Sequence, residues 1–347
     1  MDTSPIIEII NQAADEDIFT AAALIVLKER KTIVEEYFGQ TGISNPAPVN
    51  EDTLFDLASL TKVLATTPCW IKHLEKHPES LDYPIEAWIG DLPEDKLKIT
   101  PRLLLAHSSG LPAWKPYYLF ARNSEHKKFV IDRIVKENLD YPVGSGSIYS
   151  DLGFILLGRL LEVISGKDLV ATCNDWIYEP LNLTDRLLFR PDIRSRQITQ
   201  TRQEDTSGEV NDLNARALGG VSGHAGLFGT ARGVAELAAE FLRSLKTDSG
   251  FFNRKILEVF VKPCGYGSDS SRALGFDTNT QIGSSCGSLF GKSSFGHTGF
   301  TGTSLWIDPD RDLAVVFLTN RVLMGEPDMR IKKLRPELHD SIIRSLY

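Results

Sequence analysis

Hydrophobic and polar positions in the first forty residues follow first a helical and then a strand period. Residues 4–14 suit a short helix, and residues 21–27 and 32–38 are strand-like runs on either side of a polar turn at 28–31. Two such runs joined by a short polar segment predict an antiparallel hairpin. A further helical period begins at Ser59, with one face made of Leu60, Val63, Leu64 and Thr67.

The middle of the chain is predicted to be helical and rich in loops. Residues 151–164 (DLGFILLGRLLEVI) form a strongly apolar helical segment, and Gly166 just beyond it is a typical stop signal. Residues 200–229 are polar and glycine-rich, which indicates loops. Thr230 then caps an amphipathic helix whose apolar face consists of Val234, Leu237, Ala238, Phe241, Leu242 and Leu245.

Strand patterns return in the last quarter of the chain. Residues 303–307 and 313–318 flank a turn at 308–311 and predict a second hairpin, and residues 336–346 suit a closing helix. Strands at both ends with helices between them predict an α/β fold of the α+β type, in which both termini build one antiparallel sheet flanked by the terminal helices. We expect an α/β domain from residues 1–75 and 230–347, a helical insertion domain at 76–229, and an active-site cleft between them.

Composition and charge narrow the functional classes. With 347 residues, 42% hydrophobic and 24% charged, the chain is typical of a soluble globular protein. The net charge of −8 argues against a nucleic-acid binder, which usually carries a basic patch. One basic cluster is expected on a solvated helix face or at a helix entry; it consists of Arg330, Lys332, Lys333 and Arg335.

The chain shows no sign of a membrane span or of export. The longest apolar run, residues 21–27, is too short to cross a bilayer. The first residues lack the basic and apolar regions of a secretory signal. We expect a cytoplasmic protein, or a periplasmic one if a leader has been removed, and the sequence does not predict an oligomeric state. Scattered cysteines agree with a reducing compartment; they are Cys69, Cys173, Cys264 and Cys286.

Ser59 and Lys62 form an S-x-x-K motif where the helical period begins. Positions three apart lie on one face of a helix, so the hydroxyl and the amine can meet, and a helix start favours developing negative charge. A serine hydroxyl needs a nearby base to act as a nucleophile. A neutral lysine can serve, at a cost of about 4 to 5 kcal/mol for lowering its pKa from about 10.4 to about 7. Taken alone, the motif is more often an ordinary helix start than a site.

Two further motifs have structural explanations of their own. Tyr149-Ser150-Asp151 directly precedes the helix at 151–164, where Ser150 or Asp151 is also a plain N-cap. His297-Thr298-Gly299 precedes the strand at 303–307, where a simple turn would account for it. Only the combination of the three motifs points to a site.

In this order, the three motifs resemble the serine β-lactamase and penicillin-binding-protein superfamily. The resemblance is strongest to its class C β-lactamase-like branch, which includes esterases and D,D-peptidases. Three other stretches are similar to segments of that family: LLLAHSSGLP at 103–112, PLNLTD at 180–185 and AGLFGTA at 225–231. The similarity runs from about residue 20 to residue 320.

The resemblance implies a role for each residue. Ser59 would attack the substrate carbonyl and form an acyl-enzyme, while Lys62 and Tyr149 would share the proton transfers. The backbone amides of Ser59 and Phe300 would form the oxyanion hole, where one donor typically contributes about 3 to 4 kcal/mol. No metal or cofactor is implied. The substrate-binding edge would consist of Asp151, His297, Thr298 and Gly299.

Two residues depart from many class C β-lactamases. Asp151 stands where those enzymes carry Asn, and His297 where they carry Lys. The Lys-Thr-Gly edge normally receives the carboxylate of a lactam drug, whereas His297 is largely neutral. Asp151 would repel that carboxylate by roughly 2 to 3 kcal/mol, for a separation of about 6 Å and an effective dielectric of about 20. We therefore expect weak β-lactamase activity.

Other candidate sites are weaker. Residues 283–287 (GSSCG) match G-x-S-x-G but lack the preceding strand and following helix of a nucleophile elbow. His73 and His77 are four residues apart, yet a helix end explains them better than a metal site. His107 and His224 are candidates for the cleft lining, with structural hydrogen bonding as the commoner role.

The sequence thus favours an esterase-like serine hydrolase that cleaves an ester or amide through an acyl-enzyme on Ser59. The expected substrates are small-molecule esters, amides or peptidoglycan-derived compounds. A D,D-peptidase or muropeptide hydrolase is the alternative within the same chemistry. A catalytically silent binding protein with the same fold is the alternative of another class, and the joint presence of Ser59, Lys62 and Tyr149 argues against it.

Overall fold

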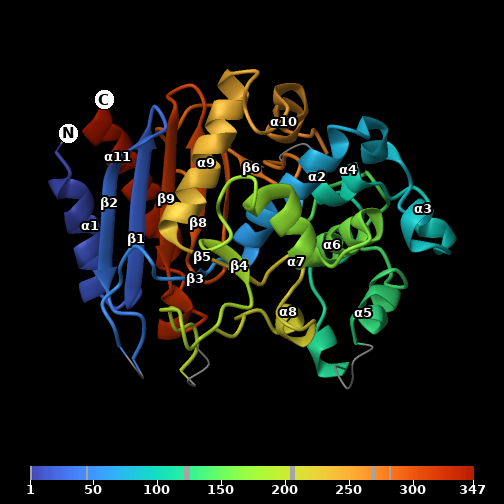
Figure 1. Ribbon diagram of the computed structural model, residues 1–347, viewed down its shortest axis with the longest axis horizontal. Coiled ribbons are helices and arrows are strands. Elements are labelled where there is room, and N and C mark those ends of the chain that lie inside the picture. Colours follow the sequence, from blue (N-terminus) through green and yellow to red (C-terminus); the bar gives the residue numbers. More distant parts are fainter. Residues whose placement is uncertain (1, 44–45, 121–125, 204–207, 267–269, 281–282) are drawn as a thin grey trace.

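A computed structural model describes residues 2–43, 46–120, 126–203, 208–266, 270–280 and 283–347 (Figure 1). Its strands are β1 (Ala21–Lys28), β2 (Lys31–Gly39), β3 (Phe55–Asp56), β4 (Leu187–Phe189), β5 (Leu227–Gly229), β6 (Asp277–Thr278), β7 (Phe295–Thr298), β8 (Ser304–Asp308) and β9 (Leu313–Thr319). Its α-helices are α1 (Ser4–Asp15), α2 (Thr67–Leu74), α3 (Glu86–Ile89), α4 (Pro101–Leu105), α5 (His126–Ile134), α6 (Asp151–Ser165), α7 (Leu169–Cys173), α8 (Leu213–Ala217), α9 (Ala231–Lys246), α10 (Arg254–Phe260) and α11 (Ile331–Leu346).

Both ends of the chain build one large antiparallel sheet, in the order β2-β1-β9-β8-β7-β6 (Figure 1). The N-terminal hairpin contributes β1 and β2, and β9 pairs with β1 to join the two ends of the chain. A small second sheet has the order β3-β5-β4. This confirms the predicted fold class and both predicted hairpins.

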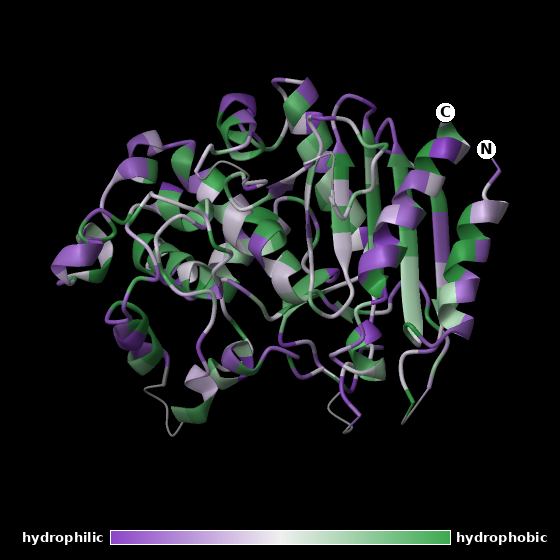
Figure 2. Cartoon of the chain, turned by 180° about the vertical axis from the view of Figure 1, so that it is seen from behind, coloured by the Kyte–Doolittle hydropathy of each residue, from purple (hydrophilic) through white to green (hydrophobic). Residues whose placement is uncertain are grey.

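Helices cover both faces of the large sheet because alternate residues of a strand point to opposite sides. In β1, Ala22, Leu24 and Val26 belong to the hydrophobic cluster shared with α1 and α11. Ala21, Ala23 and Ile25 belong to the cluster on the other face, where α9 packs. Figure 2 shows the resulting hydrophobic strands between helices of mixed character. A strand buried on both faces explains the unbroken apolar run of β1.

Local capping signals correctly predicted the start of α9 and the end of α6. Thr230 caps α9, since its side chain accepts the N–H of Gly233 at 3.0 Å. Gly166 ends α6 in the left-handed conformation, with φ of 68°.

Two expectations were wrong. The glycine-rich stretch 200–229 is not all loop, because it contains α8 and β5. The last helix begins at Ile331 rather than at 336, and Pro336 lies inside it.

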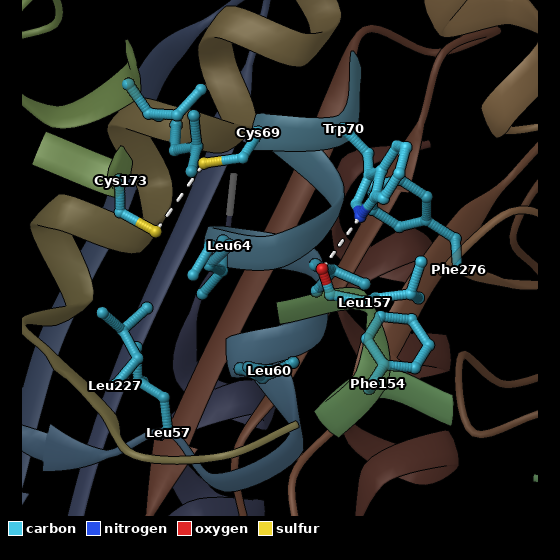
Figure 3. Packing of buried hydrophobic residues seen from close by; sticks show 14 of the residues in the cluster. Leu57, Leu60, Leu64, Cys69, Trp70, Phe154, Leu157, Cys173, Leu227 and Phe276 are labelled. Atoms are coloured by element: carbon cyan, nitrogen blue, oxygen red, sulfur yellow. Dashed lines mark hydrogen bonds between the residues drawn. The ribbon is translucent and has the colours of Figure 1, made fainter. Parts of the chain in front are cut away.

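The segment that follows Ser59 is embedded in the main hydrophobic core (Figure 3). Trp70 is fully buried on α2, and its indole N–H donates to Leu157 O at 3.4 Å. The sulfur atoms of Cys69 and Cys173 lie 3.7 Å apart, and both cysteines are free thiols. This packing holds the helical segment that contains Lys62 in a fixed position in the core.

The sheet lies at one end of the molecule and the helices α3 to α8 lie at the other (Figure 1). We propose that these two parts are the domains expected from the sequence, residues 1–75 with 230–347 and residues 76–229. The short strands β4 and β5 of the second part pair with β3 of the first. Among the described residues, we find no helix with the length and apolar character needed to cross a membrane.

Candidate active site

Ser59 lies in a 3₁₀ turn, Ala58–Leu60, directly after β3. Ala58 has a φ of +46°, a region that residues with a Cβ rarely occupy and that is often found at functional sites. The side chain of Asp56 accepts the Ala58 N–H at 2.8 Å and thereby holds this conformation. The nucleophile candidate therefore sits on a strained but firmly hydrogen-bonded turn.

The helix predicted to begin at Ser59 is in fact three consecutive segments. The 3₁₀ turn is followed by a π-helix, Lys62–Thr66, and then by α2. The expected approach of the two side chains is nevertheless present, since Lys62 Nζ donates to Ser59 Oγ at 3.0 Å. Short π-helical segments frequently occur at functional sites.

Lys62 is fully buried, and its ammonium group lies close to three oxygen atoms. They are Ser59 Oγ at 3.0 Å, the backbone carbonyl of His224 at 2.9 Å and Asp151 Oδ1 at 2.8 Å. Burial lowers the pKa of Lys62, but the neighbouring Asp151 and Tyr149 outweigh it and hold the pKa above its usual value. The free enzyme thus holds Lys62 as a cation, unlike the neutral lysine considered from the sequence.

Tyr149 contacts the same serine, and its ring lies beside Lys62, with Nζ 4.9 Å from the ring centroid. Its hydroxyl donates to Ser59 Oγ at 2.8 Å. Burial raises the pKa of Tyr149, with Lys62 opposing, so the phenol is protonated at rest. The rings of His107 and His297 lie against it, with centroid distances of 4.7 and 5.8 Å. Ser150 is also a true N-cap of α6, accepting the Gly153 N–H at 3.3 Å, so the motif has both of its possible roles.

The H-T-G motif ends β7 and contacts the turn that carries Ser59. A Cβ on Gly299 would lie 2.0 Å from Thr303 Oγ1 and 2.6 Å from Leu57 O, so only glycine permits this approach. The side chains of Thr301 and Thr303 donate to the carbonyl oxygens of Asp56 and Leu57, at 2.7 and 3.1 Å. These contacts fix β7 beside the nucleophile.

Phe300, the predicted second oxyanion residue, has its peptide group held by Arg321. The carbonyl of Phe300 accepts hydrogen bonds from Arg321 Nε at 2.9 Å and from Nη2 at 2.7 Å. In the part of the chain that the structure describes, no acceptor is recorded for the Phe300 N–H. A fixed, free N–H next to Ser59 is what an oxyanion hole requires.

Two cavities meet at Ser59, Tyr149 and Phe300. One, of about 410 Å³, lies on the β7 side and is otherwise lined by Arg272, Asp277, His297, Thr298, Gly299, Arg321, Met329, Ile331, Lys332 and Arg335. The other, of about 360 Å³, is otherwise lined by Ala58, Trp114, Asp151, Arg202, Asn211, Asp212, Leu213, His224, Ala225 and Glu326. The first is rich in cationic groups and the second in carboxylates.

Arg335 was expected on a solvated helix face, and this expectation was wrong. The side chain is only 5% exposed, and Nη2 donates to the carbonyls of Gly299 and Thr303 at 3.1 and 2.9 Å. Its Nε has no partner among the described residues. Burial lowers the pKa of Arg335 to about 9, which leaves it charged at neutral pH. A helical period starting at Ile331 would have placed Arg335 on the buried face with Leu334 and Leu338.

His297 is neutral, as the sequence suggested. Burial lowers its pKa well below the usual value. Its Nδ1 lies 2.8 Å from the carbonyl of Thr298, so this nitrogen carries the proton. Its Nε2 then has a free lone pair and no partner among the described residues.

His224, a candidate for the cleft lining from the sequence, does line the second cavity, together with Asp212, which the sequence did not assign. His224 Nε2 lies 2.9 Å from Asp212 Oδ1, and His224 Nδ1 lies 2.8 Å from Ser222 Oγ. Although burial raises the pKa of Asp212, His224 lowers it to about 2. Asp151, Asp212 and His224 present ligand atoms within 4.8 Å of one another, and within the described part of the chain they form the group that could hold a metal ion.

The competing G-x-S-x-G match does not form an elbow. Ser285 lies in an irregular turn between β6 and β7, and its hydroxyl accepts the indole N–H of Trp306 at 3.0 Å. It neither follows a buried strand nor starts a helix, as a nucleophile elbow must.

Comparison with protein families and curated proteins gives consistent results. The family model described as beta-lactamase matches residues 6–337. An N-acetylmuramyl-L-alanine amidase of Bacillus subtilis (strain 168) is 30% identical over 357 residues, covering 90% of this chain and 80% of the relative. A putative D-alanyl-D-alanine carboxypeptidase of Escherichia coli (strain K12) is 29% identical over 344 residues, covering 87% and 79%.

Solved structures with the same fold include EstCE1, a hydrolase with promiscuous acyltransferase activity, at 20% identity. Its TM-score is 0.74, and the match covers 96% of this chain and 98% of that one. A putative beta-lactamase from Bacteroides dorei DSM 17855 matches with a TM-score of 0.74 at 18% identity, covering 99% and 98%. At these identities the similarity supports the fold alone.

Proposed function

The chain belongs to the beta-lactamase family of serine hydrolases, and we propose that it cleaves an amide bond of a peptidoglycan-derived substrate through an acyl-enzyme on Ser59. The bond cleaved is one whose leaving group is an amino acid or peptide that carries a carboxylate. Two relatives bear names of this chemistry, an N-acetylmuramyl-L-alanine amidase and a putative D-alanyl-D-alanine carboxypeptidase.

In the proposed acylation, Ser59 Oγ attacks the amide carbon. The N–H groups of Ser59 and Phe300 stabilise the oxyanion, and Tyr149 donates its proton to the departing amine. The arrangement supports these roles because Tyr149 and Lys62 both hydrogen-bond to Ser59 Oγ, at 2.8 and 3.0 Å. A catalytically silent protein has no need for a fully buried lysine held against a serine, since burying a charge carries a desolvation cost even when the charge is paired.

The observation that carries the choice of substrate is the environment of Arg335. This buried guanidinium has no carboxylate partner among the described residues, and its Nε lacks any acceptor. It lines the cavity that opens on Ser59, together with Arg272, Arg321 and Lys332. Buried charges are normally paired, so a substrate carboxylate is the partner that this cavity supports best.

These arginines change the preferred function from the esterase that the sequence favoured to an amidase. Neutral His297 favoured an esterase, because the motif itself offers no cation for a carboxylate. Arg335 comes from α11 and supplies that cation from outside the motif. The charge argument for weak β-lactamase activity also loses its force, because Asp151 is neutralised by Lys62 at 2.8 Å. Hydrolysis of simple activated esters remains expected, since the acyl-enzyme chemistry is the same.

The function is tested with two muropeptides and their carboxamides. One peptide ends in D-alanyl-D-alanine, and the other is a muramyl-L-alanine compound; mass spectrometry reports which bond is cut. We expect cleavage of one of the two acids, at least tenfold slower cleavage of its carboxamide, and none with Ser59→Ala. If neither acid is cut while p-nitrophenyl acetate is hydrolysed in a Ser59-dependent manner, the protein is an esterase and the amidase proposal fails.

A further inference from the structure

The ammonium group of Lys62 has no capacity to accept a proton in the arrangement observed. Lys62 Nζ donates hydrogen bonds to Ser59 Oγ and to the His224 carbonyl, at 3.0 and 2.9 Å, and forms an ion pair with Asp151 Oδ1 at 2.8 Å. A lysine ammonium offers three donors and no acceptor. The proton of Ser59 can therefore pass to Lys62 only if Lys62 gives up one of its own at the same time.

Only one of the three acceptors can take that proton. Ser59 is the group losing a proton, and a backbone carbonyl such as that of His224 is not a base. Asp151 is a carboxylate in direct contact with Nζ. We propose that Asp151 is the final acceptor of the Ser59 proton, with Lys62 as the relay between them. This inference rests on the proposed acyl-enzyme function of Ser59.

The transfer balances without any further reactant. As Ser59 Oγ bonds to the substrate carbonyl carbon, its O–H bond breaks and a new N–H bond forms on Lys62. A different N–H bond of Lys62 breaks and an O–H bond forms on Asp151, while the carbonyl π electrons move to the oxygen. When Tyr149 has given its proton to the leaving amine, Asp151 returns its proton through Lys62 to Tyr149. All side chains then regain their starting protonation.

Asp151 is held in place for this contact by its position in the fold. It is the first residue of α6, directly after the N-cap Ser150, and its backbone N–H donates to Ala113 O at 2.9 Å. The buried oxygen Oδ1 has no hydrogen-bond partner among the described residues beyond the ion pair with Lys62. The side chain is 17% exposed and borders the second cavity, so it lies where the hydrogen-bond network meets that cavity.

A different role for Asp151 predicts the opposite effect of its asparagine variant on the acylation rate. If Asp151 only positions Lys62 and raises its pKa, the asparagine variant would free Lys62 to act as a base and would accelerate acylation at neutral pH. The other titratable or charged groups around this network are Tyr149, Asp212, His224, His107, His297 and Arg272.

The test compares Asp151→Asn with Asp212→Asn and Asp151→Glu. Asparagine keeps the shape and the acceptor oxygen toward Lys62 but takes up no proton. Asp212→Asn is the matched control, because it removes another carboxylate of the same cavity. The Asp212 carboxylate hydrogen-bonds to His224 and not to Lys62. The readouts are the acylation rate with p-nitrophenyl acetate, which is neutral, and the rate of labelling by a fluorophosphonate, each from pH 5 to pH 10.

We expect Asp151→Asn to slow acylation at pH 7 by about 100-fold or more, the usual scale for a lost general base. Its residual rate should rise toward alkaline pH, whereas the wild type is level near neutrality. Asp151→Glu should recover at least tenfold over Asp151→Asn, and Asp212→Asn should lose less than tenfold. Thermal melting shows whether each variant is folded.

Three results would overturn the proposal: Asp151→Asn as fast as the wild type or faster, an equal loss in Asp212→Asn, or no recovery in Asp151→Glu. The role of Ser59 as the nucleophile is tested separately, by labelling of the Ser59→Ala variant. If Ser59→Ala retains full labelling, the acyl-enzyme function itself fails, whatever Asp151 does.

Discussion

Arg335 donates a hydrogen bond from Nη2 to the backbone carbonyl of Gly299 at 3.1 Å. The two residues are 36 positions apart, one on α11 and the other at the end of β7. This contact brings a buried cation to the edge of the site and fixes the strand end at the same time.

For Arg335→Gln we expect a loss of about 10- to 100-fold in kcat/KM on the carboxylate-bearing muropeptide. The reason is that a hydrogen bond to a charged group contributes about 1.5 to 3 kcal/mol. Hydrolysis of neutral p-nitrophenyl acetate should change much less. Lys333→Gln is the control, because it removes an exposed charge from the same helix. Equal losses on both substrates would mean that Arg335 has only a structural role.

For Tyr149→Phe we expect kcat to fall by about 100- to 10,000-fold, the range for loss of a general acid. The variant removes the hydroxyl that donates to Ser59 Oγ at 2.8 Å and leaves the ring between His107 and His297. Tyr141→Phe is a matched control, since that hydroxyl donates to the His107 carbonyl at 2.8 Å and does not contact Ser59. Steady-state kinetics at pH 7 decide the matter, and a loss below tenfold in Tyr149→Phe would contradict the assignment.

For Lys62→Met we expect a loss of about 3 kcal/mol in the free energy of unfolding, besides the loss of activity. Removing one partner of a buried ion pair leaves the other charge uncompensated. In the variant, Asp151 keeps its negative charge without the lysine partner, and its side chain is only 17% exposed to water. Adding Asp151→Asn to Lys62→Met should restore part of the stability. Urea unfolding of the two single variants and the double variant measures the coupling, and simple additivity would rule it out.

Stability should decrease as the pH falls from about 6.5 to about 4. Burial lowers the pKa of His339 to about 4, so the folded protein holds this imidazole neutral while the unfolded chain binds a proton below about 6.5. The unfolded state therefore gains protons that the folded state refuses, and the contribution of His339 is about 3 kcal/mol, present above 6.5 and lost by pH 4. His339→Gln should flatten this part of the curve in urea unfolding between pH 4 and pH 7. An unchanged slope would contradict a buried neutral His339.

The sequence by itself determined the features that depend on neighbours along the chain. Hydrophobic periodicity located the two hairpins, and the caps at Thr230 and Gly166 followed from local hydrogen bonding. The approach of Lys62 to Ser59 was also predictable, because three positions on a helical segment bring side chains together. The family resemblance added Tyr149 and His297, which local pattern alone left open.

Only the tertiary structure decided which charges meet in the site. Arg335 reaches β7 from α11, and Lys62 meets a carboxylate 89 positions away and a carbonyl 162 positions away. Whether Lys62 is a cation and whether the β7 edge is cationic both depend on these partners. Electrostatic energies are set by distance in space and by exclusion of water, and neither is encoded in the spacing of residues along the chain.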